Sequence, residues 1–182
     1  PQLWITKNTV GTNDWMVGTT ASFNASNYQK LNSNTPWNSS SGVWNNADPT
    51  SSIIDLGTDN GTNDNNDAII CYAWHSIDGY QKVDWYGGNA VADGAFVYTG
   101  FRPFMLLTFN YDSGDMKLIV DHKRLGYNQY NLQLLPNRND AEAATGEYDI
   151  LSNGFKARTT GTSTNSSAGP TVYLAIAETP FK

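Results

Sequence analysis

The chain has 182 residues, enough for one domain or two small ones. Hydrophobic residues make up 39% of it, aromatic residues 13% and charged residues 15%, which excludes a disordered chain and favours strands over helices. The formal net charge is −6, the Lys and Arg are scattered, and no stretch approaches the roughly 20 apolar residues of a membrane-spanning helix, so we expect no nucleic-acid partner and no membrane insertion.

Short apolar segments bounded by Gly, Asn, Asp, Ser and Thr predict a series of strands. They span residues 3–5, 15–17, 53–54, 68–74, 83–86, 96–101, 104–109, 117–120 and 171–177. The one segment that could hold a helical turn is 129–144, where Pro136 limits its length. Many short strands with frequent turns predict an all-β fold, a β-sandwich of the jelly-roll or lectin-like kind.

An internal repeat appears when the chain is aligned with itself at an offset near 102 residues. Apolar and turn positions keep their order in five pairs of segments: 1–5 with 103–107, 14–17 with 117–120, 31–34 with 134–137, 54–57 with 151–154 and 70–74 with 172–176. We therefore predict one sandwich-like unit over residues 1–182, or two closely packed halves. The two diverged repeats would span about 1–79 and 102–182, joined by a hairpin at 80–101.

The second repeat is led by the apolar segment 96–101, whereas the first repeat begins directly at Pro1. The chain also begins without Met and without a signal peptide. We therefore expect a piece of a longer protein, in which a further strand precedes Pro1.

Several segments resemble a repeated, largely uncharacterised domain of predicted bacteriophage tail proteins. The segments are FVYTGFRP at 96–103, LSNGFK at 151–156 and AIAETPF at 175–181, with HSIDGY at 75–80 and DHKR at 121–124 in the same pattern. The first repeat departs from it, since DLGT at 55–58 stands where a Ser-Asn-Gly-Phe motif is expected. The resemblance implies a virion location in a tail or surface fibre, a binding role, and a homotrimer among other virion subunits. It supplies no catalytic residues.

Candidate catalytic residues are few. His75 and His122 lack a recognisable partner in the sequence, and Cys71 lies in an apolar run that predicts a small buried side chain. A glycosidase would need two paired carboxylates, and no pair stands out among the three Glu and the dispersed Asp residues. We therefore expect no enzyme activity.

Calcium is the one metal that the sequence suggests. Asp59, Asp64 and Asp67 lie with several Asn residues in one loop and offer hard oxygen ligands, although their spacing does not match an EF-hand. The corresponding loop of the second repeat, 157–169, contains no Asp. A solvated polar loop is therefore the favoured interpretation, calcium is a weaker alternative, and no other cofactor is expected.

Aromatic residues are the candidate ligand platforms, because sugar rings pack on aromatic faces. Trp37 and Trp44 lie in the polar loop 35–50, which has no Trp in the second repeat, and Trp85 and Tyr86 precede a Gly-Gly-Asn turn. We expect these four residues to bind the ligand, with Trp37 and Trp44 exposed. The aromatic residues expected in the core are Trp4, Trp15 and Trp74.

The function that fits these expectations best is a non-enzymatic phage tail-fibre or adhesin domain. It would bind a host cell-surface glycan or protein. The alternative is a structural virion module, such as a fibre segment or decoration domain, whose aromatic residues are buried against other subunits. A glycan depolymerase is the least favoured of the three interpretations.

Overall fold

The structure, a computed structural model, describes residues 1–111, 116–124 and 127–181. Strands make up 38% of the chain and helices 7%, which confirms the predicted all-β class. The helices within the described residues have four residues each: α1 (Ser41–Trp44), α2 (Asn60–Asn63) and α3 (Thr162–Asn165). None of these three is long and apolar enough to cross a membrane.

The first half of the chain, residues 1–80, forms a five-stranded antiparallel sheet in the order β4-β3-β2-β1-β5. The strands are β1 (Leu3–Asn8), β2 (Met16–Thr19), β3 (Asn27–Lys30), β4 (Asn38–Ser39) and β5 (Ile69–Trp74). β1 lies between β2 and β5 and is covered on both faces, so both alternating sets of its side chains are buried.

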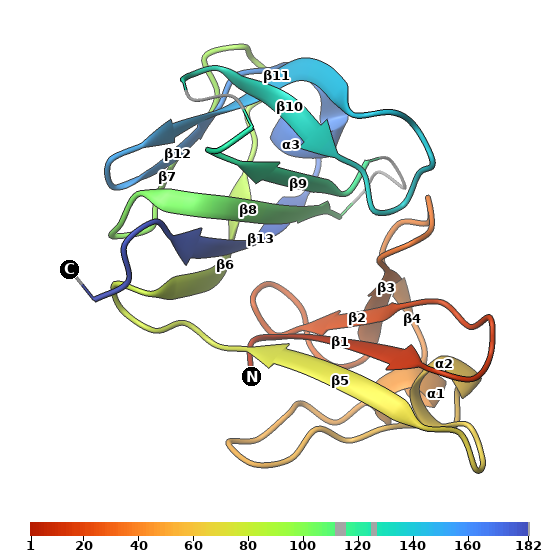
Figure 1. The fold of residues 1–182 in the computed structure, drawn as a ribbon. Coiled ribbons are helices and arrows are strands. Elements are labelled where there is room, and N and C mark those ends of the chain that lie inside the picture. Colours follow the sequence, from red (N-terminus) through yellow and green to blue (C-terminus); the bar gives the residue numbers. More distant parts are fainter. Residues whose placement is uncertain (112–115, 125–126, 182) are drawn as a thin grey trace.

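The second half, residues 81–182, forms an eight-stranded antiparallel sheet in the order β6-β13-β8-β9-β10-β11-β12-β7. The strands are β6 (Gln81–Gly87), β7 (Phe96–Tyr98), β8 (Pro103–Asn110), β9 (Leu118–Asp121), β10 (Tyr130–Leu134), β11 (Ala143–Leu151), β12 (Gly154–Ala157) and β13 (Pro170–Ala177). The sheet curls strongly, so that strands β7, β11 and β12 cover its other strands (Figure 1).

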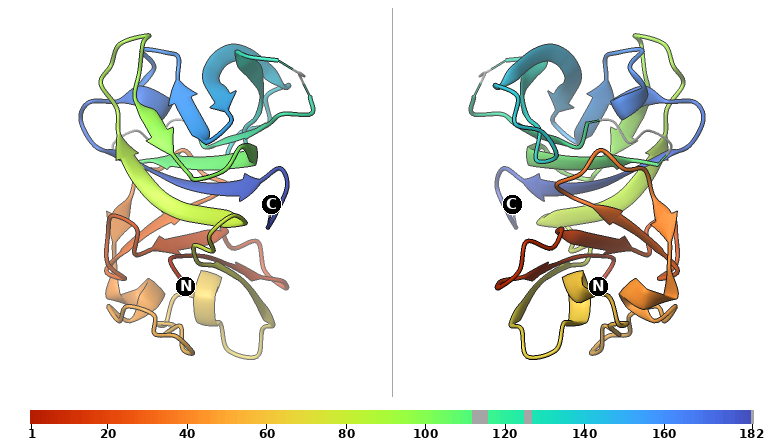
Figure 2. Two further views of the ribbon diagram at one scale, coloured as in Figure 1. Left: turned by 90° about the vertical axis from the view of Figure 1, so that its left-hand side faces the viewer. Right: turned by 90° about the vertical axis from the view of Figure 1, so that its right-hand side faces the viewer.

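The two sheets pack face to face as a sandwich, with β1 and β2 against β6, β8 and β13 (Figures 1 and 2). This packing buries the set of side chains that alternate toward the partner sheet. The shared core contains Leu3, Ile5, Val17, Trp37, Val83, Leu107, Phe109, Val172 and Leu174.

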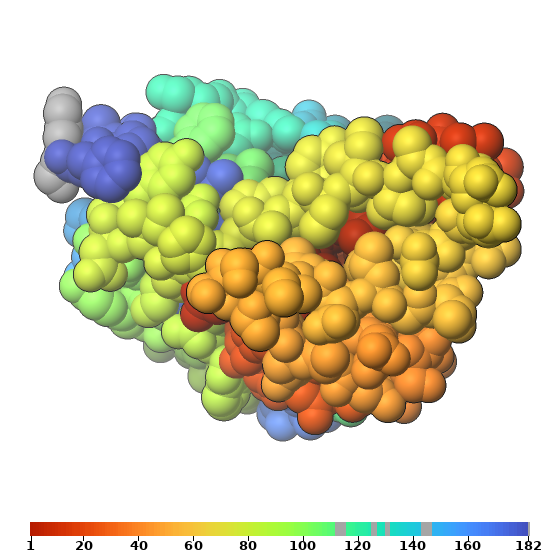
Figure 3. All heavy atoms as spheres, turned by 90° about the horizontal axis from the view of Figure 1, so that it is seen from below, coloured from red at the N-terminus to blue at the C-terminus, as the bar shows by residue number. Residues whose placement is uncertain are grey.

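Each sheet has a second covered face. In the second half the curled sheet encloses Tyr86, Val97, Leu106, Leu118, Val120, Tyr148, Ile150, Phe155, Ala157, Tyr173 and Ala175, which we call the barrel core. In the first half the loop between β4 and β5, with α1 and α2, covers the lower side, where it appears in orange and gold beside β5 in yellow (Figure 3). Under that cover lie Trp4, Met16, Ala25, Val43 and Trp44, which we call the tryptophan core.

The ladders of the two halves match at a constant offset of 102 residues. β1 pairs with β2 and β5 as β8 pairs with β9 and β13. The matching register pairs are Leu3–Trp74 with Met105–Ile176, Trp4–Ala73 with Leu106–Ala175, and Ile5–Val17 with Leu107–Ile119.

The same offset relates helix α2 to helix α3. In the first half the Asn63 side-chain Nδ2 donates to the carbonyl oxygen of Gly57 at 2.9 Å. In the second half the Asn165 Nδ2 donates to the carbonyl oxygen of Thr159 at 2.7 Å. This agreement supports the predicted duplication of 1–79 and 102–182, which remains a prediction.

Some expected elements are wrong. Residues 80–101 do not form a hairpin, because β6 pairs along its whole length with β13, while β7 pairs with β12. Residues 129–144 hold strand β10 and the start of β11 instead of a helical turn, and residues 53–54 form no strand. For β6, β7, β10 and β11, pairing with other strands, which the local pattern does not reveal, decides the conformation.

Cys71 is exposed, contrary to the buried side chain that its apolar run predicts. The reason is that β5 lies at the edge of the five-stranded sheet, where it pairs with β1 on one side. Its neighbours Ile70 and Tyr72 are 46% and 44% exposed. The apolar run therefore marks an edge strand and not a central one.

Candidate functional site

An open polar groove of about 670 Å³ lies in the first half, and we call it the β2–β3 groove. It is lined by the segment before β2, by β2 and β3, by α1, and by the start of α2. The lining residues are Thr12, Asn13, Asp14, Met16, Tyr28, Lys30, Gly42, Thr58, Asp59, Asn60 and Gly61.

An ion pair forms part of the groove lining. The Lys30 Nζ lies 2.8 Å from the Asp14 Oδ2, and both side chains are about one-third exposed. The other carboxylate oxygen, Asp14 Oδ1, accepts a hydrogen bond from the Asn32 Nδ2 at 3.0 Å. The hydrogen bond to Asp14 raises the pKa of Lys30, with the charges of Asp14 and Asp59 adding to it and burial opposing it. The cation of this wall is therefore neutralised within the protein.

Asp59 stands at the N-terminus of helix α2, which also lines the groove. Its Oδ1 caps the helix by accepting from the Gly61 backbone N–H at 2.8 Å. Among the described residues no hydrogen bond is made to Oδ2, so one oxygen of this carboxylate is free for a ligand. The neighbouring Asn60 side chain is exposed.

Two glycines and a tyrosine give the groove its shape. A Cβ at Gly61 would come within 2.9 Å of the Met16 Cγ, so a glycine allows α2 to approach β2 closely. At Gly42 a Cβ would meet only hydroxyl oxygens at 3.3 Å or more, so this position opens into the groove. Tyr28 is half-buried against the tryptophan core and exposes part of its surface to the groove.

The segment before β2 is held by Lys7, whose Nζ donates to the carbonyl oxygen of Asn13 at 2.6 Å and lies 3.4 Å from that of Gly11. The groove is thus preformed by contacts within the protein. A small, hydroxyl-rich ligand would suit this groove, because its lining offers one carboxylate oxygen, amides, hydroxyls and a tyrosine.

A family model described as "Domain of unknown function (DUF7483)" matches residues 1–180, which include both sheets and the groove. The chain belongs to this family. It has no match among the curated proteins and none among the solved structures.

In this DUF7483 domain the expected exposure of Trp37 and Trp44 is wrong. Trp44 is fully buried in the tryptophan core, with its ring edge-on to Trp4 at a centroid distance of 5.5 Å. Trp37 is 7% exposed and stacks on Phe23 at 5.0 Å in the core between the two sheets. The polar loop therefore places one indole in the core between the sheets and the other in the tryptophan core, on opposite faces of the five-stranded sheet.

The other two aromatic candidates, Trp85 and Tyr86, differ in their exposure to solvent. Trp85 is 47% exposed, as a ligand platform requires, whereas Tyr86 is buried in the barrel core. The Tyr86 hydroxyl lies 2.9 Å from the Tyr148 hydroxyl, and burial raises the pKa of Tyr86 well above its usual value. Adjacent residues of a strand point to opposite faces, so one faces solvent and the other the core. Tyr86 is therefore not accessible to a ligand.

The turn that follows Tyr86 is held in place by Asn165 of helix α3. The Asn165 Nδ2 faces the Asn89 Oδ1 at 3.0 Å and the Val91 carbonyl oxygen at 2.7 Å. The Asn165 Oδ1 accepts from the Asn89 backbone N–H at 3.0 Å. Asn165 is fully buried, so this network acts as a structural bracket.

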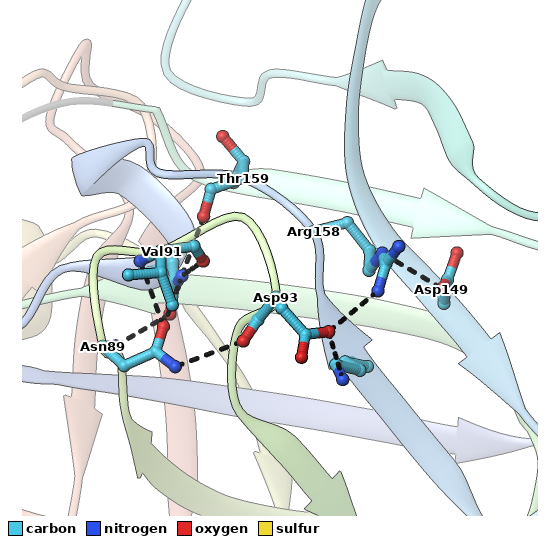
Figure 4. A network of polar contacts seen from close by, with 8 residues as sticks. Asn89, Val91, Asp93, Asp149, Arg158 and Thr159 are labelled. Carbon is cyan, nitrogen blue, oxygen red and sulfur yellow. Dashed lines mark hydrogen bonds and ion pairs between the residues drawn. The ribbon is translucent and has the colours of Figure 1, made fainter.

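Asp93 extends the bracket to strand β12 and the residue after it. Its Oδ1 lies 2.6 Å from the Lys156 Nζ and 3.2 Å from an Arg158 guanidinium nitrogen (Figure 4). The hydrogen bond and charge of Lys156 lower the pKa of Asp93, with Arg158 adding to it. Arg158 in turn lies 3.3 Å from Asp149.

The three calcium candidates accept hydrogen bonds from groups of the protein. Asp59 caps α2, Asp64 accepts from the backbone N–H of Asn65 at 2.8 Å, and Asp67 accepts from the Asn8 side chain at 2.8 Å. Within the part of the chain that the structure describes, no three His, Cys, Asp or Glu residues are grouped as metal ligands. The hydrogen bonds favour the polar-loop interpretation, and calcium binding stays untested.

The histidines and glutamates lie apart from the groove. His75 is exposed, while His122 is buried with its Nε2 3.5 Å from Glu178, which also pairs with Arg102 at 2.9 Å. Burial lowers the pKa of His122. The remaining glutamates are Glu142, paired with Arg124, and Glu147, which accepts from the Thr164 hydroxyl.

Sequence reasoning missed the groove residues Asp14, Tyr28 and Lys30. They belong to a turn and to a strand that was not predicted, and they come together only through the pairing of β2 with β3. The one signal in the sequence is the pair of opposite charges Asp14 and Lys30, which lie just before β2 and at the end of β3. The sequence does point to Asp59, but as a calcium ligand.

Proposed function

We propose that this DUF7483 domain is a non-enzymatic receptor-binding domain of a bacteriophage tail or surface fibre. Its receptor would be a glycan or protein of the host cell surface, engaged through the β2–β3 groove. The phage assignment rests on the resemblance of the segments at 96–103, 151–156 and 175–181. The binding role rests on the groove.

The observation that carries the binding role is the asymmetry of the two halves. The face of β8 and β9 that corresponds to the groove side of β1 and β2 is filled by the barrel core. In the first half the equivalent face carries short helices and a preformed hollow with free polar groups. A fold that needed only stability could fill both faces alike.

The test is an occlusion experiment with a matched control. Gly42→Gln projects a side chain into the groove, and Gly87→Gln adds the same side chain at a position with no atom within 4 Å of a Cβ. Both variants should keep the melting temperature of the wild type. We expect only Gly42→Gln to lose binding to host cells or to a glycan array, and equal binding by both would reject the groove.

The alternative, a structural virion module, is favoured by one observation, the exposed edge strand β5. Tyr72 stacks between Trp15 and Trp74, each at a centroid distance of 6.3 Å, and is nearly half exposed. Such an edge can pair with a neighbouring chain. The resemblance implies a homotrimer, which has closed symmetry. Light scattering tests this oligomeric state. A strict monomer at micromolar concentration would place trimerisation outside this domain.

A further inference from the structure

The charge of the chain is divided unequally between its halves. Residues 1–80 contain two Lys and seven Asp, a formal charge of −5. Residues 81–182 contain nine Lys and Arg against ten Asp and Glu, a formal charge of −1. The half that carries the β2–β3 groove therefore holds nearly all of the net negative charge.

The residues that line the groove also carry more negative than positive charge. Its one cation, Lys30, is paired with Asp14 at 2.8 Å. Asp59 lines it without a salt bridge among the described residues, and only one of its oxygens is used by the helix cap. A ligand would therefore meet an unneutralised carboxylate and the neutral amide of Asn60.

We infer that the receptor recognised by this groove is a saccharide without acidic groups, an inference that rests on the function proposed above. A carboxylate oxygen accepts strong, charge-assisted hydrogen bonds from sugar hydroxyls. A uronate, sialate or phosphate group in the same place would stand beside Asp59 and would be repelled by it. The half-buried Tyr28 offers a face for the C–H side of a sugar ring.

Asp59→Asn is the sharpest variant, because Asn caps a helix about as well as Asp and keeps the shape of the side chain. Binding to a panel of neutral, amino-substituted and acidic oligosaccharides is measured for four proteins: the wild type, Asp59→Asn, Gly42→Gln and the control Gly87→Gln. We expect the wild type to bind only members without acidic groups. Asp59→Asn should weaken that binding by roughly tenfold, as lost charge assistance implies, and Gly42→Gln should abolish it.

The outcomes separate this inference from the proposed function. Binding of an acidic oligosaccharide that Gly42→Gln abolishes would overturn the inference and leave the receptor-binding role intact. An unchanged affinity of Asp59→Asn for a neutral ligand would also overturn it. Failure of the wild type to bind both the panel and host cells would reject the proposed function, and the inference with it.

Discussion

The two halves of the molecule share a strand core and differ in what covers it. In both, a central strand is flanked by the same neighbours in the same register, β1 by β2 and β5, and β8 by β9 and β13. The second half covers its outer face with strands of its own sheet, whereas the first half uses a loop with short helices. The same ladder order is thus compatible with two covers, and the cover of the first half leaves the β2–β3 groove open.

The packing of the paired strands shows how each cover is accommodated. In the first half Trp4 lies opposite Gly18, and in the second half Leu106 lies opposite Val120 at the same offset. A Cβ at Gly18 would collide with the Trp4 indole. One half therefore combines a very large with a very small residue, and the other uses two of medium size.

The largest effect that we expect comes from removing an indole of the tryptophan core. Trp44→Ala should lower the free energy of unfolding by about 3–5 kcal/mol, because a fully buried aromatic side chain leaves a cavity. Urea unfolding measures this loss. Trp85→Ala, which removes a half-exposed indole, is the control and should cost under about 1 kcal/mol. A Trp44→Ala variant as stable as wild type would contradict the burial of the loop.

The Trp4–Gly18 pair gives a sharper test of the comparison. Gly18→Val should cost about 2–3 kcal/mol by overpacking against the indole. Combined with Trp4→Leu it recreates the Leu106–Val120 pair. The double variant should therefore lose about 1–2 kcal/mol less unfolding free energy than the two single variants lose together. Thermal unfolding of the four proteins of this cycle provides the measurement. Strict additivity would mean that the two halves do not pack equivalently.

The two equivalent asparagines should differ in energetic weight. Asn165 is buried and holds the turn after β6, whereas Asn63 is exposed and makes one such contact. Asn165→Ala should cost about 2–3 kcal/mol and Asn63→Ala under about 1 kcal/mol, since only the former leaves buried groups without partners. Chemical denaturation compares them. Equal losses would show that the bracket contributes nothing beyond the shared contact.

The smallest effect concerns Lys117, which stands where the first half has Trp15. Its Nζ donates to the Ser33 carbonyl oxygen at 2.7 Å and lies 3.4 Å from that of Thr35. Burial lowers the pKa of Lys117 to about 8. The unfolded chain then binds more protons than the folded one between pH 8 and 10.5, so stability should rise with pH in this window.

A pH series of unfolding curves measures this rise. Between pH 8 and 9.5 the wild type should gain on the order of 1–2 kcal/mol relative to Lys117→Met, which has no ammonium group to titrate. A constant difference between the two proteins over this range would mean that Lys117 keeps an ordinary pKa in the folded protein.

How far the sequence leads depends on how local the determining contacts are. Alternating or continuous apolar runs located β1, β2, β5, β8, β9 and β13, because a buried strand needs apolar side chains at short, regular spacing. The offset of 102 residues was also readable from the sequence, and the ladder registers follow it. The all-β class needed nothing more.

The covers and the site depended on contacts between distant residues. β3 has few apolar side chains in its sequence and exists as a strand because β2 pairs with it. Trp37 and Trp44 lie in a Ser- and Asn-rich loop that reads as exposed, yet Trp37 is buried between the two sheets and Trp44 is buried in the tryptophan core on the other face of the first sheet. The sequence by itself determined the strand core, since its pattern is local. Only the tertiary structure decided which loop became a cover and where a groove remained, because burial of a loop depends on the surface against which it folds.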